Sequence, residues 1–236
     1  MHINAKSQRA LLWVFLIGAN IYTLAFWKLM GFFPPVPANL SDAEIVPLYA
    51  DHNIQFLIGA VIMMASAGFQ IPLIIVVAAQ MARLEKGYAL WSKMQLVAGT
   101  LGTWLFAFPP FLWGVTAFTV ERDPALTQML HEMAWLCFVT PPTYFALQVF
   151  PMAIVAMSKD NNDPLSAFPR WFGYLTFWEG IAGIFGMMGM LFKVGPFAWN
   201  GWFAFYLPVV TFAIWLACLL PLLFRGIRLQ EAAAKG

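Results

Sequence analysis

Residues 55–81 read QFLIGAVIMMASAGFQIPLIIVVAAQM and contain no Asp, Glu, Lys or Arg. About 20 consecutive apolar residues in an α-helix cross the hydrocarbon core of a bilayer, which is roughly 30 Å thick. An uncharged run of this length is typical of a transmembrane helix. We therefore predict that residues 55–81 span a membrane.

The composition of the whole chain agrees with this prediction. Of 236 residues, 61% are hydrophobic and 10% are charged, and the mean hydropathy is +0.74, whereas about a quarter of a soluble domain is charged. The net charge of +2 is too small to indicate a nucleic-acid partner. Cys137 and Cys218 both fall in apolar runs, which excludes a disulfide framework. The partner that the composition predicts is the lipid bilayer.

Five further apolar runs are long enough to be spans. The six predicted spans are residues 10–32, 55–81, 94–118, 127–157, 171–192 and 199–224. The chain shows no internal repeat of fixed period and no low-complexity linker. The predicted fold class is therefore all-α, a polytopic bundle of six transmembrane helices that forms one domain over residues 1–236.

Basic residues lie almost entirely on one side of this predicted bundle. Ten of the 13 Lys and Arg residues fall in the two terminal segments and in the second and fourth connections. The opposite side keeps Lys28, Arg122 and Lys193 beside an acidic cluster. Because short cytoplasmic loops carry the excess of Lys and Arg, we predict that both termini are cytoplasmic.

Two loop sequences predict where helices begin. Ser41, with Glu44 three residues later, resembles a capping box and predicts a short interfacial helix before the second span. Asp123 combines a capping carboxylate with Pro124, a residue suited to the first helical position, and predicts the start of the fourth span.

Prolines interrupt three of the predicted spans. They are Pro72 in the second span, Pro109 and Pro110 in the third, and Pro141, Pro142 and Pro151 in the fourth. Each proline lacks an N–H and displaces the carbonyl group four residues earlier. We predict broken third and fourth helices, with two interpretations open: kinks that neighbouring helices tolerate, or a cavity between these two spans.

Glu179 lies about nine residues into the predicted fifth span, or roughly 13 Å at 1.5 Å per residue, which is near the bilayer midplane. A carboxyl group there must be neutral, paired or in contact with water. The candidate partners are Thr176 and Tyr174 on the same helix, and Gln70, Thr103 and Gln148 elsewhere. Glu179 is either a functional group or a protonated side chain that holds two helices together.

A glycine stripe, formed by Gly180, Gly183, Gly186 and Gly189, recurs every three residues on the same span. Small residues let helices approach closely in lipid. The stripe predicts a helix contact, either within the bundle or between two copies of the chain in a homo-oligomer. A groove for a flat cofactor is the alternative.

The predicted outer ends of the helices hold the densest group of polar side chains. The catalytic candidates are His52, His131 and Glu132 there, with Glu179 deeper, and both histidines are candidate cofactor ligands. The candidate ligand pocket adds Asn53, Gln55, Arg122, Asp123, Tyr144, Lys193 and Asn200. Two imidazoles on one side permit haem ligation, metal binding or acid–base chemistry. No metal motif such as HExxH is present, so no dedicated metal site is predicted, and two histidines hydrogen bonded at the water interface are the alternative.

Two resemblances to known proteins add expectations. Residues 168–175 (FPRWFGYL), 192–201 (FKVGPFAWNG) and 121–124 (ERDP) resemble uncharacterised bacterial membrane proteins of similar length, which implies a bacterial inner-membrane location. Residues 50–53 (ADHN) resemble the opening of the second helix in styrene oxide isomerases, which are small haem-containing membrane enzymes. The second resemblance implies haem b bound through His52, although that family has four spans where six are predicted here.

Two classes of function follow. The first is a cavity opening to the outer leaflet that binds a small hydrophobic molecule or haem and transforms it as an isomerase-like enzyme would, using His52, His131 and Glu132. The second is a small-molecule or proton-coupled carrier that uses Glu179, or an accessory subunit of a membrane complex without chemistry of its own. The sequence is compatible with both.

Overall fold

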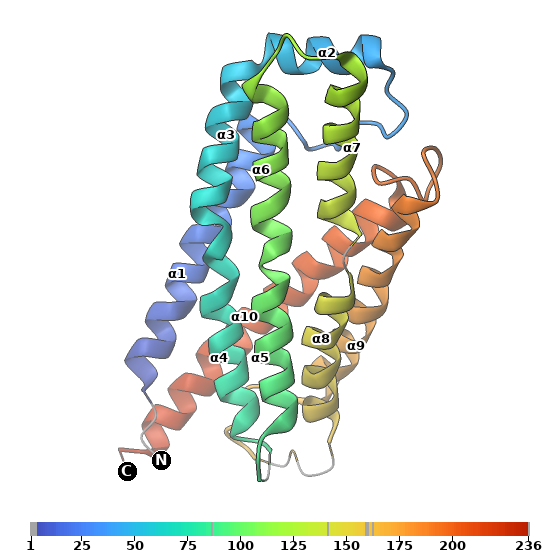
Figure 1. Ribbon diagram of the computed structural model, residues 1–236. Coiled ribbons are helices and arrows are strands. Elements are labelled where there is room, and N and C mark those ends of the chain that lie inside the picture. Colours follow the sequence, from blue (N-terminus) through green and yellow to red (C-terminus); the bar gives the residue numbers. More distant parts are fainter. Residues whose placement is uncertain (1–3, 86, 141, 159–160, 162, 236) are drawn as a thin grey trace.

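The computed structural model describes residues 4–85, 87–140, 142–158, 161 and 163–235, and over these residues its regular structure is entirely helical (Figure 1). The helices are α1 (Ala5–Leu24), α2 (Asp42–Asp51), α3 (Asn53–Ser66), α4 (Gln70–Ala82), α5 (Leu90–Gly102), α6 (Trp104–Phe118), α7 (Pro124–Val139), α8 (Pro142–Met157), α9 (Arg170–Ile184) and α10 (Leu207–Ala233). The prediction of an all-α bundle is confirmed.

Several of these helices join end to end into longer apolar runs. Five runs are long and apolar enough to cross a membrane: Ala5–Leu29, Asn53–Ala82, Leu90–Phe118, Pro124–Met157 and Trp202–Ala233. They correspond to the first four and the last of the predicted spans. The chain is therefore a multi-pass membrane protein by the length and composition of its helices.

The predicted fifth span, residues 171–192, forms α9 and a following 3-10 turn, Phe185–Met190. It is not among the five runs, because Glu179 and the glycine stripe lower its hydropathy. This segment still packs inside the bundle, where α9 lies beside α8 and α10 (Figure 1).

Three of the long runs are broken near mid-height. A 3-10 turn at Ala67–Phe69 separates α3 from α4, Thr103 separates α5 from α6, and α7 ends at Val139 before α8 begins. The first break directly precedes Pro72, whose ring displaces the helical carbonyl four residues earlier. Pro109 and Pro110, by contrast, lie inside α6, so the break in the third span falls one to two turns before them. Pro141 lies outside the described residues.

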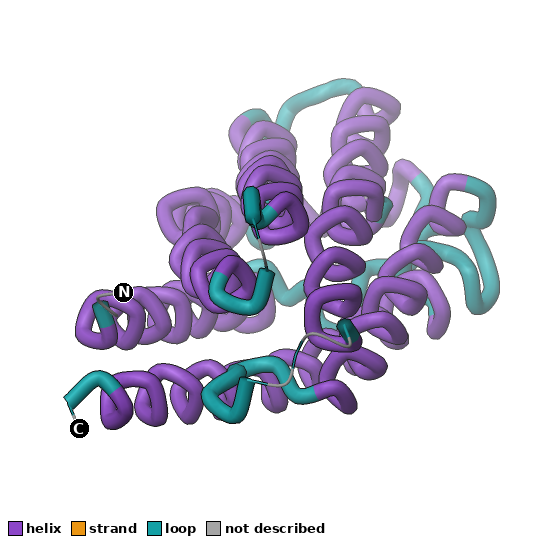
Figure 2. Tube along the Cα trace, turned by 90° about the horizontal axis from the view of Figure 1, so that it is seen from below, coloured by secondary structure: helices purple, strands orange, loops and turns teal. Residues whose placement is uncertain are grey.

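The two ends of the chain meet at one end of the bundle (Figures 1 and 2). There the Arg9 guanidinium group pairs with the Glu231 carboxylate at 2.8 Å. Lys86 and Lys159, which the topology prediction also used, lie outside the described residues. An even number of crossings would bring the termini to the same side.

A glutamine cluster, formed by Gln8, Gln80 and Gln230, lies beside this ion pair. The Gln80 side-chain amide donates to Gln8 at 2.7 Å, and Gln80 and Gln230 exchange hydrogen bonds of 3.1 and 2.8 Å. Both Gln80 and Gln230 are buried. The cluster joins α1, α4 and α10 with uncharged groups, which satisfies polar atoms that lipid would not.

The other end of the bundle is covered by α2, which lies across it (Figure 1). This helix begins with the predicted capping box, since the Ser41 N–H and hydroxyl donate to the Glu44 carboxylate at 2.9 and 2.7 Å. The predicted cap at Asp123 is also present, because its carboxylate accepts from the Ala125 N–H at 2.8 Å. Beneath α2 the core is aromatic, with Phe32, Trp113 and Trp135 fully buried and in mutual contact.

Candidate ligand-binding site

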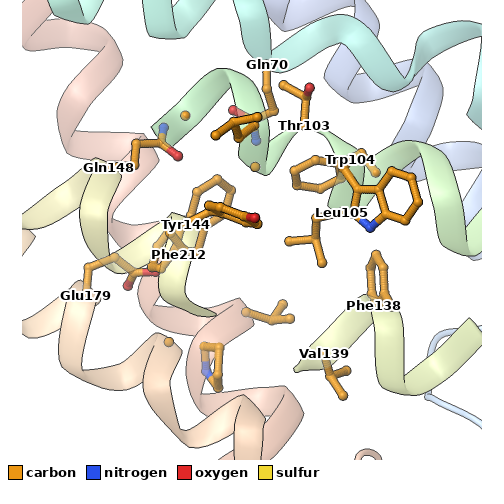
Figure 3. Close-up of a pocket in the computed structure, with 18 of the residues that line it drawn as sticks. Gln70, Thr103, Trp104, Leu105, Phe138, Val139, Tyr144, Gln148, Glu179 and Phe212 are labelled. Carbon is orange, nitrogen blue, oxygen red and sulfur yellow. The ribbon is translucent and has the colours of Figure 1, made fainter. Parts of the chain in front are cut away.

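A cavity of about 220 Å³ lies at mid-height, where the broken helices meet (Figure 3). Its walls come from α4, from both sides of the α5–α6 and α7–α8 breaks, from α9, and from α10 with the turn before it. The polar lining residues are Gln70, Thr103, Tyr144, Gln148 and Glu179. For comparison, an apolar cavity of about 150 Å³ accepts benzene, so this cavity has room for a small organic molecule.

The prolines explain why a cavity forms at this height. Pro109 and Pro110 have no N–H, so the carbonyl groups of Leu105 and Phe106 lack their usual helical donors. Both residues line the cavity. Phe138, which precedes Pro142 by four residues, also lines it and loses its helical donor in the same way. The third and fourth spans both contribute to the cavity wall, at the residues whose carbonyl groups lose a helical donor to proline.

Among the described residues that line the cavity, Glu179 is the one Asp, Glu, Lys or Arg. Its side chain is 1% exposed, and its Oε2 atom has no hydrogen-bond partner among the described residues. Thr211 of α10 lies beside the carboxyl group, but the Thr211 hydroxyl donates to the Leu207 carbonyl oxygen at 2.9 Å. Figure 3 shows Glu179 and Gln148 on one side of the cavity, with Trp104 and Phe138 on the other. An unpartnered polar atom buried at this depth is costly and marks a functional candidate.

The wall behind Glu179 is held in place by the contact between α9 and α10. One turn before Glu179, the Thr176 hydroxyl accepts from the Trp215 indole N–H at 3.0 Å and donates to the Phe172 carbonyl oxygen at 2.8 Å. Trp215 is buried and lines the cavity. The hydrogen bond fixes the orientation of the indole ring, which stacks against Phe172 and Phe212 at centroid distances of 6.1 and 5.7 Å.

The glycine stripe brings α9 close to α8 and to the end of α7. A Cβ atom on Gly180 or Gly183 would lie 2.5 and 2.8 Å from the rings of Phe150 and Phe145. A Cβ atom on Gly186 would overlap the Val139 carbonyl oxygen, which belongs to the backbone. The stripe is thus covered within the chain, and the predicted homo-oligomer through these glycines has no support.

Most of the lining is apolar and aromatic. Phe145 and Phe212 contact each other with ring centroids 6.4 Å apart, and Phe212 stacks on Trp215 at 5.7 Å. Across the cavity, the Trp104 ring stacks on Phe108 at 4.1 Å. Among the described residues that line the cavity there is no Lys, Arg or His.

The cavity is not sealed from the surface of the bundle. Four of its lining residues, Leu101, Trp104, Tyr144 and Val209, are exposed. Because they lie at mid-height on apolar helices, the opening faces the hydrocarbon part of a bilayer. A molecule dissolved in lipid would have direct access.

The two histidines of the predicted site lie in different environments. His52 is exposed at the junction of α2 and α3, and its Nδ1 atom lies 3.3 Å from the Leu48 carbonyl oxygen. His131 is fully buried in α7, where its Nδ1 atom shares a hydrogen bond of 2.8 Å with the hydroxyl of Tyr49. Burial raises the pKa of the Tyr49 phenol, which remains a neutral hydrogen-bonding group. Neither histidine lines the cavity.

Glu132, the third member of the predicted outer site, forms an ion pair with Lys193 at 2.7 Å. The remaining predicted pocket residues also have local roles at this end. Asn53 donates to the Ala117 carbonyl oxygen, Arg122 donates to that of Val115 at 3.1 Å, Asn200 accepts from the Ala38 N–H at 3.3 Å, Asp123 caps α7, and Gln55 is exposed. Of the predicted site residues, the cavity unites only Glu179 and Tyr144.

The residues present do not fit a haem in this cavity, since neither His52 nor His131 reaches it. The Nε2 atom of His131 has no hydrogen-bond partner among the residues that the structure describes, but the ring packs among the indoles of Trp135 and Trp199 at centroid distances of 6.4 and 6.0 Å. In the described part of the chain, no group of three or more His, Cys, Asp or Glu side chains is placed to hold a metal ion.

The sequence identified part of the cavity. Gln70, Thr103 and Gln148, the distant residues named as candidate partners of Glu179, all line it. The aromatic residues Trp104 and Phe212 were not anticipated, because nothing in the neighbouring sequence distinguishes them from lipid-facing aromatic residues.

Comparison with protein-family models, with curated proteins and with solved structures finds no match to this chain.

Proposed function

We propose that the protein crosses the membrane six times and binds a small, largely hydrophobic molecule in the cavity around Glu179. In this proposal α9 is the additional span, both termini are cytoplasmic, and the protein resides in the inner membrane of a bacterium. The distribution of Lys and Arg supports the orientation. The packing of α9 against α8 and α10 supports its membrane location.

The observation that carries the binding proposal is the buried Oε2 atom of Glu179, a residue of the mainly apolar cavity lining, which has no hydrogen-bond partner in the part of the chain that the structure describes. An interior that only needed to pack would place an apolar residue there, since an unpaired buried polar group destabilises the fold. A few polar groups in a mainly apolar, concave site are the usual composition of a ligand site. The bound molecule supplies the missing partner.

A matched pair of substitutions at the opening tests this proposal. Val209 and Val210 are adjacent in α10 and similarly exposed, at 41% and 49%, but only Val209 lines the cavity. Val209→Trp fills the opening, whereas Val210→Trp adds the same side chain to the lipid-facing surface. The probe is naphthalen-1-ylmethanol, and its binding to the purified protein in detergent is measured by isothermal titration calorimetry.

We expect saturable binding to the wild-type protein and to Val210→Trp, and at least tenfold weaker binding to Val209→Trp. Equal affinities for the two variants would show that the probe binds elsewhere. Absence of saturable binding to the wild-type protein would contradict the proposal directly.

A carrier is the second candidate function, favoured by the position of the helix breaks. Three of the long apolar runs are interrupted at the height of the cavity. In many transporters, discontinuous helices form the substrate site near the bilayer midplane. Uptake of the same probe into reconstituted vesicles, with Glu179→Gln compared with Glu121→Gln in the outer loop, separates a carrier from a binding protein.

A further inference from the structure

We infer that the ligand is a lipophilic ammonium compound, an aromatic or cage-like hydrocarbon with one protonated amine, which binds in exchange for the proton of Glu179. The inference rests on the proposed function and specifies the chemical class of the molecule. It follows from the kinds of hydrogen-bonding groups that line the cavity, from its aromatic walls and from the isolation of the carboxyl group.

The lining has an excess of hydrogen-bond acceptors. Glu179 contributes a carboxyl group, and the carbonyl oxygens of Leu105, Phe106 and Phe138 have lost their helical donors to prolines. The donors among the described lining side chains are neutral, namely the amides of Gln70 and Gln148, the Tyr144 hydroxyl and the Trp104 indole N–H. The Thr103 hydroxyl already donates to the Thr100 carbonyl oxygen at 2.6 Å. An anionic ligand would find no positive group in the described lining. An ammonium group brings up to three donors to these acceptors, together with a positive charge that the described lining lacks.

The aromatic walls favour the same class of ligand. Phe145, Phe212 and Trp215 form a continuous aromatic surface near Glu179, and Trp104 lies on the opposite side. Cations are attracted to the faces of Trp, Tyr and Phe rings, most strongly where water is excluded. The Trp215 N–H is already used by Thr176, so it is not free to donate to a ligand.

Inorganic cations fit the cavity less well. Ca²⁺ takes six to eight oxygen ligands, and Mg²⁺ usually keeps several waters while binding one or two carboxylates. The cavity supplies one carboxyl group in a mostly apolar lining, and the described residues contain no group of three or more His, Cys, Asp or Glu side chains placed to hold a metal ion. A hydrocarbon body is needed to fill the remaining surface.

The charge of Glu179 determines how such a ligand binds. A carboxyl group without a positive partner in an apolar interior retains its proton, because the charged form is poorly solvated. Binding of R–NH₃⁺ creates a carboxylate–ammonium pair and releases one proton: Glu–COOH + R–NH₃⁺ gives Glu–COO⁻·R–NH₃⁺ + H⁺. No bond other than the carboxyl O–H is broken, and the buried site stays electrically neutral before and after binding.

The other titratable groups near Glu179 do not change this balance. From α8, Tyr144 contributes a phenol. From α10, Thr211, Phe212 and Trp215 do not titrate. Among the described lining residues of α4 and of the break between α5 and α6, Gln70 and Thr103 are neutral. One proton is therefore exchanged for one ligand.

Three naphthalene compounds with one ring system and different head groups test the inference. They are naphthalen-1-ylmethylamine, which is cationic, naphthalen-1-ylmethanol, which is neutral, and 1-naphthoate, which is anionic. Their affinities for the full-length protein in one detergent are measured by calorimetry. We expect the amine to bind at least tenfold more tightly than the alcohol, and the carboxylate to bind most weakly, because charge-assisted hydrogen bonds are about twice as strong as neutral ones.

Glu179→Gln should abolish the preference for the amine while retaining affinity for the alcohol, since Gln keeps the shape and removes the charge. Glu121→Gln in the exposed outer loop is the matched control and should retain the preference.

A measurement on the wild-type protein alone adds a test that does not depend on folding of a variant. The affinity for the amine should rise about tenfold per pH unit while the free carboxyl group is protonated, because one proton is released per ligand, whereas the affinity for the alcohol should not change.

The outcomes separate the two proposals. Equal affinities for all three compounds, a preference for the carboxylate, or pH-independent binding of the amine would overturn the ammonium inference and leave hydrophobic binding intact. Failure of all three to bind saturably, with Val209→Trp unchanged from wild type, would overturn the proposed function as well.

Discussion

Gly186→Ala is expected to destabilise the protein far more than an alanine substitution in the other 3-10 turn. A Cβ atom at Gly186 would overlap the backbone carbonyl oxygen of Val139, and Val139 lines the cavity. A backbone atom cannot rotate away as a flexible side chain can, so the Phe185–Met190 turn after α9 and the end of α7 must separate. Gly68 in the Ala67–Phe69 turn has open space at the same atom position.

The magnitude follows from these two environments. Overpacking of a close-packed interior costs about 1–3 kcal/mol, and the backbone contact puts Gly186→Ala at or above the upper end of that range. Gly68→Ala meets no contact and reduces the freedom of the unfolded chain, so its effect is between zero and a gain of about 1 kcal/mol. We expect the two variants to differ by at least about 2 kcal/mol in the free energy of unfolding.

The free energy of unfolding is measured by titration of the micellar protein with sodium dodecyl sulfate, followed by circular dichroism. Gly186→Ala should also weaken binding of naphthalen-1-ylmethylamine, because movement of Val139 changes the cavity wall. If the two variants unfold at the same denaturant fraction, the close approach of α7 and α9 described above is wrong.

Two further predictions concern single hydrogen-bonded groups. Thr176→Val, which keeps the side-chain shape but leaves the buried Trp215 N–H without its acceptor, should lower the free energy of unfolding by about 1–3 kcal/mol. The control is Thr127→Val, on a buried threonine away from the cavity whose hydroxyl donates to the Asp123 carbonyl oxygen at the start of its own helix; an equal loss would show that the Trp215 contact is unimportant. Hydrogen bonds from Ser41 hold the pKa of Glu44 below its ordinary value of 4.5, so the stability that Glu44 lends to α2 is present above pH 4.5 and is lost as pH falls below that value. Hydrogen exchange of the α2 amides, compared between wild type and Glu44→Gln, should show this acid-induced opening only in the wild type.

The sequence predicted those features that depend on local patterns. Long uncharged runs specified the apolar helices, the Ser41–Glu44 and Asp123–Pro124 pairs specified helix starts, and the depth of Glu179 marked it as a functional candidate. Each of these follows from residues within a few positions of each other. The prediction also placed Gln70, Thr103 and Gln148 as possible neighbours of Glu179, because few polar residues occur at that depth.

The hydropathy pattern did not determine how each helix is rotated about its own axis. His52 and His131 share one end of the bundle, yet one faces solvent and the other faces the aromatic core. Hydropathy gives depth in the membrane but not direction, so it grouped side chains that point apart. A break in the third span was predicted at Pro109 and Pro110, but it lies at Thr103, because these prolines weaken the turns before them while remaining helical themselves.

The glutamine cluster has a consequence for the order in which the chain is assembled. Gln80 and Gln230 are 150 positions apart, and the amide of Gln80 is hydrogen bonded to Gln8 and Gln230. During synthesis, α1 and α4 therefore enter the bilayer well before the partner on α10 has left the ribosome. The last helix to emerge completes the amide network, so a chain truncated before Gln230 would retain an unsatisfied polar group that quality-control proteases can recognise.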